Sequence, residues 1–467
     1  MKKLNLILLL AALNTSIFAE NITFKGTISS IPSGTATHIY LFAHIAGGTV
    51  FVDSTKLDSK GRFSYTSKLD LGAGLYYVSI DKVNLKPLIL SKSEPETSIT
   101  ATYDEWNQGK VNIKGSKENK AYDILQQVLN NHQQQIKQFA ERVNTSRVDS
   151  FYKREMETIE DHLSYRYTQL NQVIFNINNE YKGTFVGDIL SPMFIVPQMS
   201  EYPSVSQNYD NSVSFLHDHF WDLSDFKDQR VLNTPQFTNK LNEYIGSYSD
   251  FNSAKGTSTI DNVLARAKAN PMVFDYCVRY LLNAFSENKL DGMMSYIIKK
   301  YIDTYEGKLM DGTKAYVNSF RQFLVGMKVN DFSANTPKGE AVALSNLLAK
   351  HKAVLLYFWS SEDKGSTAMN NDLKQLLAAV NTPEFGIMGI GIEKDGIKWK
   401  NTIDQLGLSW VNVSDLKGVN SALIPQFNIK KLPHLLLLRA DGTIVSRNPN
   451  MQQLMAILLE AFQAKNK

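Results

Sequence analysis

The sequence predicts an α+β multidomain protein with an N-terminal antiparallel β-sandwich, an α-helical middle domain and a C-terminal α/β domain. Three observations predict it. Short β-branched and aromatic runs separated by turn residues fill residues 20–116, apolar residues recur at helical spacing over 117–325, and strand-like runs alternate with helix-like runs over 326–467. A chain of 467 residues that is 43% hydrophobic is long enough for three domains with buried cores.

Residues 1–19 have the pattern of a secretory signal peptide. Two lysines open the segment, an apolar run from Leu4 to Leu13 follows, and small residues lead to a cleavage position expected near Ala19. The apolar run is too short to cross a bilayer, and no later segment has the roughly 18 consecutive apolar residues that a span requires. The sequence therefore predicts an exported, soluble protein without a transmembrane segment.

Charge and cysteine content narrow the possible functions. The formal net charge is +4 and the charged residues are scattered, so no basic cluster predicts a nucleic-acid partner. The one cysteine, Cys277, lies in a helix-like run and cannot form an internal disulfide. We interpret Cys277 as a small buried apolar residue, with a reactive or intermolecular thiol as the alternative.

The first domain is expected to contain eight short strands joined by turns. One connection, Asp58-Ser59-Lys60-Gly61, is a strong hairpin signal because glycine adopts positive φ without a steric cost. The predicted strands are Ile22–Ser29, Thr37–His44, Thr49–Leu57, Arg62–Lys68, Gly74–Asp81, Leu85–Lys92, Thr97–Tyr103 and Val111–Ser116. Evenly spaced short strands favour a sandwich or barrel.

The middle domain is expected to open with two long helices, the second running from about Asp149 to Tyr181. Further on, His217-Asp218-His219 resembles a metal-ligand cluster. On a helix the side chains at i and i+2 point about 200° apart, so we predict no shared metal ion and a solvated or capping role instead. The neighbouring Phe220-Trp221 pair is expected to pack in the core.

In the C-terminal domain, the buried-strand run at 354–359 leads into a polar loop and then a helix. The further predicted elements are helices at 366–380, 396–406 and 451–464, strands at 387–393 and 410–413, and a hairpin of strands at 435–439 and 443–447 around Ala440-Asp441-Gly442. Alternating strands and helices imply a mainly parallel sheet, which the hairpin closes.

Three stretches of this domain resemble the thioredoxin superfamily, in particular its exported TlpA-like and redoxin-type members. VLLYFWSSED is similar to the strand and loop before the redox site, IMGIGIEKDGIKWKNTIDQLGLSW to the inserted strand and helix, and FNIKKLPHLLLLRADGTIV to the cis-proline segment, with Pro433 in the matching place. The first two thirds resemble, more distantly, the β-sandwich domain of unknown function and the helical domain that precede such modules in exported proteins of Gram-negative bacteria. The resemblance implies a periplasmic location.

At the redox position the chain departs from the family pattern. Asp363-Lys364-Gly365-Ser366 stands in place of Cys-x-x-C, and no cysteine follows Cys277. Disulfide exchange needs an attacking thiolate and a resolving thiol, and the peroxidatic step also needs cysteine. Asp363, Ser366 and Pro433 therefore mark a degenerate redox site, and we predict no catalytic residue, no cofactor and no metal. Asp363 or Ser366 is expected to cap the following helix.

Two sharper interpretations of this region stay open. Glu362, Asp363 and Ser366, together with His434, could form a hydrolytic or binding site, although a serine nucleophile also needs an oxyanion hole and an oriented base. The second interpretation is an apolar groove for an extended peptide. The groove would be lined by Trp359, Leu432, Pro433 and His434.

The sequence thus predicts an exported thioredoxin-like protein without redox cysteines, a non-enzymatic binding or scaffolding protein of the cell envelope. Its partner would be an envelope protein or peptide. Two alternatives remain: a thiol-disulfide oxidoreductase or redoxin-class protein, as the fold suggests, and a ligand-binding envelope protein that uses the β-sandwich or the helical domain.

Overall fold

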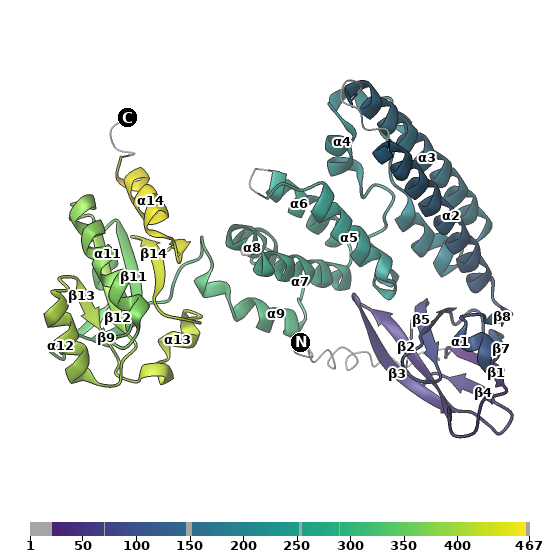
Figure 1. The fold of residues 1–467 in the computed structure, drawn as a ribbon, viewed down its shortest axis with the longest axis horizontal. Coiled ribbons are helices and arrows are strands. Elements are labelled where there is room, and N and C mark those ends of the chain that lie inside the picture. Colours follow the sequence, from purple (N-terminus) through teal and green to yellow (C-terminus); the bar gives the residue numbers. More distant parts are fainter. Residues whose placement is uncertain (1–20, 70, 146–151, 252–254, 289, 464–467) are drawn as a thin grey trace. The chain divides into compact units, whose positions relative to one another are not determined.

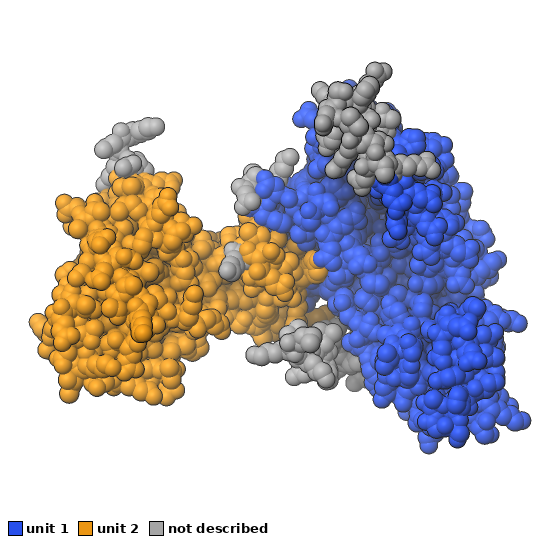
Figure 2. Space-filling model, viewed as in Figure 1, with its two compact units in different colours: residues 1–276 blue, residues 277–467 orange. Residues whose placement is uncertain are grey.

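The computed structural model describes residues 21–69, 71–145, 152–251, 255–288 and 290–463 (Figure 1). The expected signal peptide lies outside the described residues. The chain forms two compact units, residues 1–276 and 277–467 (Figure 2). Their division falls inside helix α7 (Pro271–Glu287) and coincides with neither of the expected boundaries after residues 116 and 325, so the three-domain division stays a prediction.

The first unit begins with a β-sandwich, and all eight predicted strands are present. They are β1 (Thr23–Ser29), β2 (His38–Ile45), β3 (Gly48–Lys56), β4 (Arg62–Thr66), β5 (Gly74–Ser79), β6 (Lys86–Leu90), β7 (Ser98–Thr102) and β8 (Asn112–Lys114). One sheet has the order β4-β1-β7-β8 and the other β3-β2-β5-β6. Alternate residues of both sheets, among them Phe24, Ile39, Val78 and Ile99, share one buried core.

The sandwich differs from the prediction at one pairing, because β1 and β7 run parallel whereas every other neighbouring pair in the two sheets is antiparallel. The predicted hairpin joins β3 to β4. There Gly61 has φ +73°, and a Cβ on it would lie 1.8 Å from the carbonyl oxygen of Ile28. Only glycine fits this close approach of two backbones.

Helices make up the rest of the first unit. After the short α1 (Tyr103–Asn107) come α2 (Lys117–Thr145), α3 (Tyr152–Glu180), α4 (Ser212–His219), α5 (Pro235–Ser247) and α6 (Lys255–Ala267). The long helices α2 and α3 lie side by side (Figure 1), and the Phe139 and His162 rings stack between them at 5.2 Å. Phe220 and Trp221 are buried, which confirms their predicted place in the core.

The second unit continues with α8 (Asp291–Ile297) and α9 (Asp311–Asn318) and ends in the predicted α/β domain. Its elements are β9 (Ser333–Asn335), β10 (Ala341–Ala343), α10 (Leu344–Leu348), β11 (Ala353–Trp359), α11 (Lys364–Val380), β12 (Phe385–Gly391), α12 (Gly396–Leu406), β13 (Val411–Val413), α13 (Leu423–Gln426), β14 (His434–Arg439), β15 (Ile444–Arg447) and α14 (Met451–Gln463). The predicted strands and helices named above are all present in the predicted order, and β9, β10, α10 and α13 are additional to those named.

The main sheet of this domain has the order β13-β12-β11-β14-β15. β13, β12 and β11 are parallel, and β14 and β15 form the antiparallel closing hairpin that the sequence predicts. One face of the sheet, with Tyr357 and Trp359, packs against α11, α12 and α14. Among the helices that the structure describes, none has both the length and the hydrophobicity needed to cross a membrane.

Candidate functional site

The candidate site lies where β11 ends and α11 begins. β11 is buried along its whole length, as expected for an apolar central strand, and the chain turns at Ser360 into a polar loop. Asp363 has extended backbone angles, and its side chain accepts a hydrogen bond from the backbone N–H of Ser366 at 2.6 Å. Asp363 is therefore the N-cap of α11, a contact that contributes about 0.5–2 kcal/mol and confirms the expected capping role.

Ser366, at the second cysteine position, is fully buried. Its hydroxyl donates to the Asp363 carboxylate at 2.8 Å and accepts from the backbone N–H of Ser360 at 3.3 Å. The Tyr357 hydroxyl donates to the Ser366 carbonyl oxygen at 2.8 Å, and burial raises the pKa of Tyr357. The Ser366 hydroxyl is thus bonded within the domain and closed off from solvent.

A second carboxylate, Glu393, lies two residues after β12 and holds the loop before α11. It is buried and accepts hydrogen bonds from the backbone N–H of Ser361 and from the Ser361 hydroxyl, the latter at 3.1 Å. Burial raises the pKa of Glu393. The loop is also tied to α12 by the Glu362–Lys398 ion pair at 2.7 Å, whose hydrogen bond raises the pKa of Lys398.

The cis-proline segment faces the start of α11. The Leu432–Pro433 peptide bond is cis, as the resemblance implied. A Cβ on Gly365 would lie 3.1 Å from Cδ of Pro433, so the two segments are in direct contact. Leu432 and Pro433 are half-buried and Gly365 is exposed, which leaves the edges of this contact open to solvent.

The structure places Trp359 and His434 on opposite faces of the sheet. His434 pairs with Phe358 across β14 and β11, and their rings lie 5.9 Å apart, whereas Trp359 stacks with Tyr357 on the other face at 6.2 Å. Both Trp359 and His434 are buried. The four-residue groove expected from the sequence is therefore wrong in two members, and only Leu432 and Pro433 reach the surface.

The residues of the hydrolytic alternative are not brought together either. Ser366 and Asp363 meet, but His434 lies on the other side of the sheet, where its Nδ1 is 3.3 Å from the Asn448 amide nitrogen. No base therefore reaches the Ser366 hydroxyl from the cis-proline segment. Glu393 is the residue that the sequence reasoning missed, and the available signal was a carboxylate at the end of the strand predicted over 387–393.

His434 is buried without a partner for its second ring nitrogen. Its Nε2 makes no hydrogen bond to any residue that the structure describes. Burial, with Arg447 as a second cause, lowers the pKa of His434 to about 4 from an ordinary value of 6.5. The folded domain therefore keeps this imidazole neutral at pH values where an unfolded chain would protonate it.

We predict that His434 makes the domain less stable as the pH falls from 6.5 to about 4. In this window the unfolded chain binds a proton that the folded state excludes. The resulting loss of stability is absent above pH 6.5 and grows to about 3 kcal/mol below the folded pKa. His434→Phe, which keeps an aromatic ring beside Phe358, should reduce the pH dependence of Tm in calorimetry of the full chain. A control, His351→Gln, changes a half-exposed histidine of the same domain. An unchanged pH dependence in His434→Phe would contradict the assignment.

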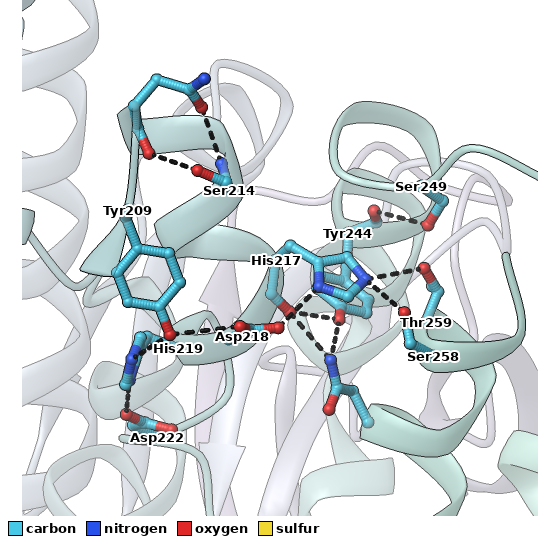
Figure 3. A network of polar contacts seen from close by, with 12 residues as sticks. Tyr209, Ser214, His217, Asp218, His219, Asp222, Tyr244, Ser249, Ser258 and Thr259 are labelled. Carbon is cyan, nitrogen blue, oxygen red and sulfur yellow. Dashed lines mark hydrogen bonds and ion pairs between the residues drawn. The ribbon is translucent and has the colours of Figure 1, made fainter. Parts of the chain in front are cut away.

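A separate polar network lies in the first unit around His217 (Figure 3). His217 Nδ1 lies 2.7 Å from the Asp218 carboxylate, and its Nε2 lies 3.1 Å from the Ser258 hydroxyl and 3.3 Å from that of Thr259. His219 instead contacts Tyr209 at 3.1 Å and the carboxylate of Asp222 at 2.7 Å. The two histidines therefore point to different partners, as predicted. The expected solvated or capping role is wrong for His217, which is buried.

This network connects helices α4 and α6. Although serine, histidine and aspartate follow one another as in hydrolases, His217 is buried and its Nε2 is shared between two hydroxyls. Such an arrangement satisfies a buried ring and fixes the packing of the two helices. In the described part of the chain, no three His, Cys, Asp or Glu residues are grouped so that they could hold a metal ion.

Comparison with known families agrees with this fold. A family model described as thioredoxin-like matches residues 351–444, and two domains of unknown function, DUF4369 and DUF5106, match residues 22–122 and 154–298. A search of curated proteins finds no match. The cis-proline, the sheet order and the family model define a thioredoxin-like domain. Residues 351–444 belong to the thioredoxin-like family, and the two domains of unknown function lie N-terminal to them.

Several solved structures resemble part of the chain. A thiol-disulfide oxidoreductase from Bacteroides fragilis is 30% identical, over 28% of this chain and 98% of that one, with a TM-score of 0.27. The thioredoxin domain of a thiol-disulfide oxidoreductase from Bacteroides vulgatus is 21% identical, over 29% and 96%, with a TM-score of 0.27. A thioredoxin-like protein from Bacteroides caccae is 17% identical, over 53% and 92%, with a TM-score of 0.37.

Proposed function

We propose that this chain is an exported protein of the cell envelope whose thioredoxin-like domain binds a partner polypeptide and does not exchange disulfides. One observation carries the proposal: the residues at the two redox positions, Asp363 and Ser366, are hydrogen-bonded to each other at 2.8 Å, and Asp363 caps the helix. The signal-peptide pattern of residues 1–19 supports export.

The oxidoreductase alternative lacks a nucleophile. Disulfide exchange proceeds through a thiolate, and no cysteine occurs from residue 278 to residue 467. Cys277 is fully buried in α7, and burial raises the pKa of its thiol. Both properties oppose attack on a disulfide in a substrate protein, because a reactive cysteine is accessible and readily ionised.

The binding role is supported by the exposed surface around the cis-proline segment. The cis-proline segment still faces the helix start, and Leu432, Pro433 and Gly365 retain exposed surface. The loop before α11 is held by Glu393 and by the Glu362–Lys398 pair, so it does not need to be ordered when a partner arrives. A rigid surface of this kind loses less conformational entropy on binding an extended peptide.

The first test of this proposal restores the thiols. In a Cys277→Ala background, we expect Asp363→Cys/Ser366→Cys to reduce insulin disulfides with dithiothreitol severalfold faster than the uncatalysed reaction. The two side chains already meet, and the start of a helix stabilises a thiolate. Wild type and Cys277→Ala should both match the uncatalysed rate. Activity in wild type that Cys277→Ala abolishes would overturn the proposal.

The second test addresses binding. Peptides are first selected from a displayed random library on the immobilised full chain. They should bind Leu432→Asp about tenfold more weakly than wild type, because a charge replaces the apolar surface beside the cis-proline. Leu459→Asp is the matched control, since Leu459 is an exposed leucine on α14 of the same domain. The binding role is refuted if every selected peptide binds Leu432→Asp as tightly as wild type.

A further inference from the structure

The degenerate redox site lies at one edge of the sheet, and this edge extends well beyond the cis-proline. Because β11, β12 and β13 are parallel, their carboxyl ends share one edge, and the amino end of β14 lies there too. Helices α11 and α12 both begin at this edge, after Asp363 and Asp395. In open α/β sheets, ligands bind outside the carboxyl ends of the strands.

This edge contains a hollow of about 920 Å³. Three segments line it: residues 335–337 after β9, residues 394–397 at the start of α12, and residues 414–416 after β13. The buried indole of Trp399 also contributes to its wall. The hollow adjoins the candidate site, because Glu393, which holds Ser361, directly precedes the second of these segments.

Apolar side chains are exposed around the hollow. Ile397 is 76% exposed, Leu416 43% and Val419 74%. Leu416 packs against the start of α12, where a Cβ on Gly396 would lie 3.0 Å from its Cδ1. Ile397 and Leu416 both line the hollow, and Val419 follows Leu416 by three residues. Exposed apolar side chains gathered at a hollow are typical of interaction sites.

Along the same edge, the acidic side chains have partners within the domain whereas most lysines do not. Five exposed lysines make no ion pair with any residue that the structure describes: Lys364, Lys394, Lys417, Lys430 and Lys431. Lys398 and Lys400, also exposed, pair with Glu362 and Asp404. The carboxylates are already engaged. Asp363 and Asp395 cap helices, Glu393 is buried, and Asp415 accepts from the Ser421 hydroxyl at 2.8 Å. The helix N–H groups offset the charge of the two caps, which leaves the lysines unneutralised.

We propose that this edge, from the hollow at Ile397 to the cis-proline loop, is a docking surface for an acidic, extended polypeptide segment of a partner protein. Carboxylates of the segment would pair with Lys394 and with the lysines before Pro433, and an apolar side chain would contact Ile397 and Leu416. The inference rests on the proposed binding function and adds the chemistry of the partner.

Three labelled synthetic peptides of equal length test the surface in fluorescence polarisation with the full chain. One alternates glutamate with leucine, one lysine with leucine, and one glutamate with serine. We expect the glutamate–leucine peptide to bind about tenfold more tightly than either of the others, and the advantage over the lysine peptide to shrink as added salt screens the charges.

Matched variants locate the binding. Lys394→Glu should weaken the glutamate–leucine peptide about threefold to tenfold, whereas Lys350→Glu, an exposed lysine at the amino end of β11, should not. Ile397→Ser should weaken it and Leu459→Ser should not. If all three peptides bind equally and Leu432→Asp abolishes that binding, this inference is overturned but the proposed function is not. No binding of any of the three peptides would also overturn this inference, and the peptides selected from the random library test the proposed function separately.

Discussion

The Asp363 carboxylate at the start of α11 is the contact on which the candidate site depends. A helix N-terminus presents unpaired N–H groups and the positive end of a dipole, so it favours a negative charge. In thiol enzymes that preference stabilises a thiolate. Here a carboxylate occupies the position, bonded to the backbone and the hydroxyl of Ser366. The preference for an anion is kept while the capacity to attack sulfur is lost.

The other carboxylates of the edge follow the same pattern. Glu393 holds the loop through Ser361, Asp395 caps α12, and Glu362 pairs with Lys398. Each stabilises the scaffold, and together they leave most lysines of the edge without an acidic partner. If the proposed function holds, the absence of disulfide exchange and the affinity for an acidic partner have one physical origin, which is the use of acidic side chains as structural anchors.

Much of the fold could be predicted because local patterns determine it. Strand runs, helical periodicity and the Asp363 cap are readable from neighbouring residues, and the place of Pro433 follows from the family resemblance. Sheet register is not, and a shift of one residue decides whether a side chain faces one layer or the other. That is why Trp359 and His434 were expected to share a groove although His434 is paired with Phe358. The parallel pairing of β1 and β7, and the hydrogen bonds of Glu393, likewise depend on contacts between segments distant in sequence.

Hydrogen–deuterium exchange of the full chain, with and without saturating glutamate–leucine peptide, tests the central claim most directly. The claim is that the edge of the sheet beside the degenerate redox site is a binding surface. It predicts slower exchange in residues 360–366, 394–397 and 430–433, where the loop, the hollow and the cis-proline segment lie. Protection confined to the β-sandwich, residues 23–114, with no change along this edge, would contradict it.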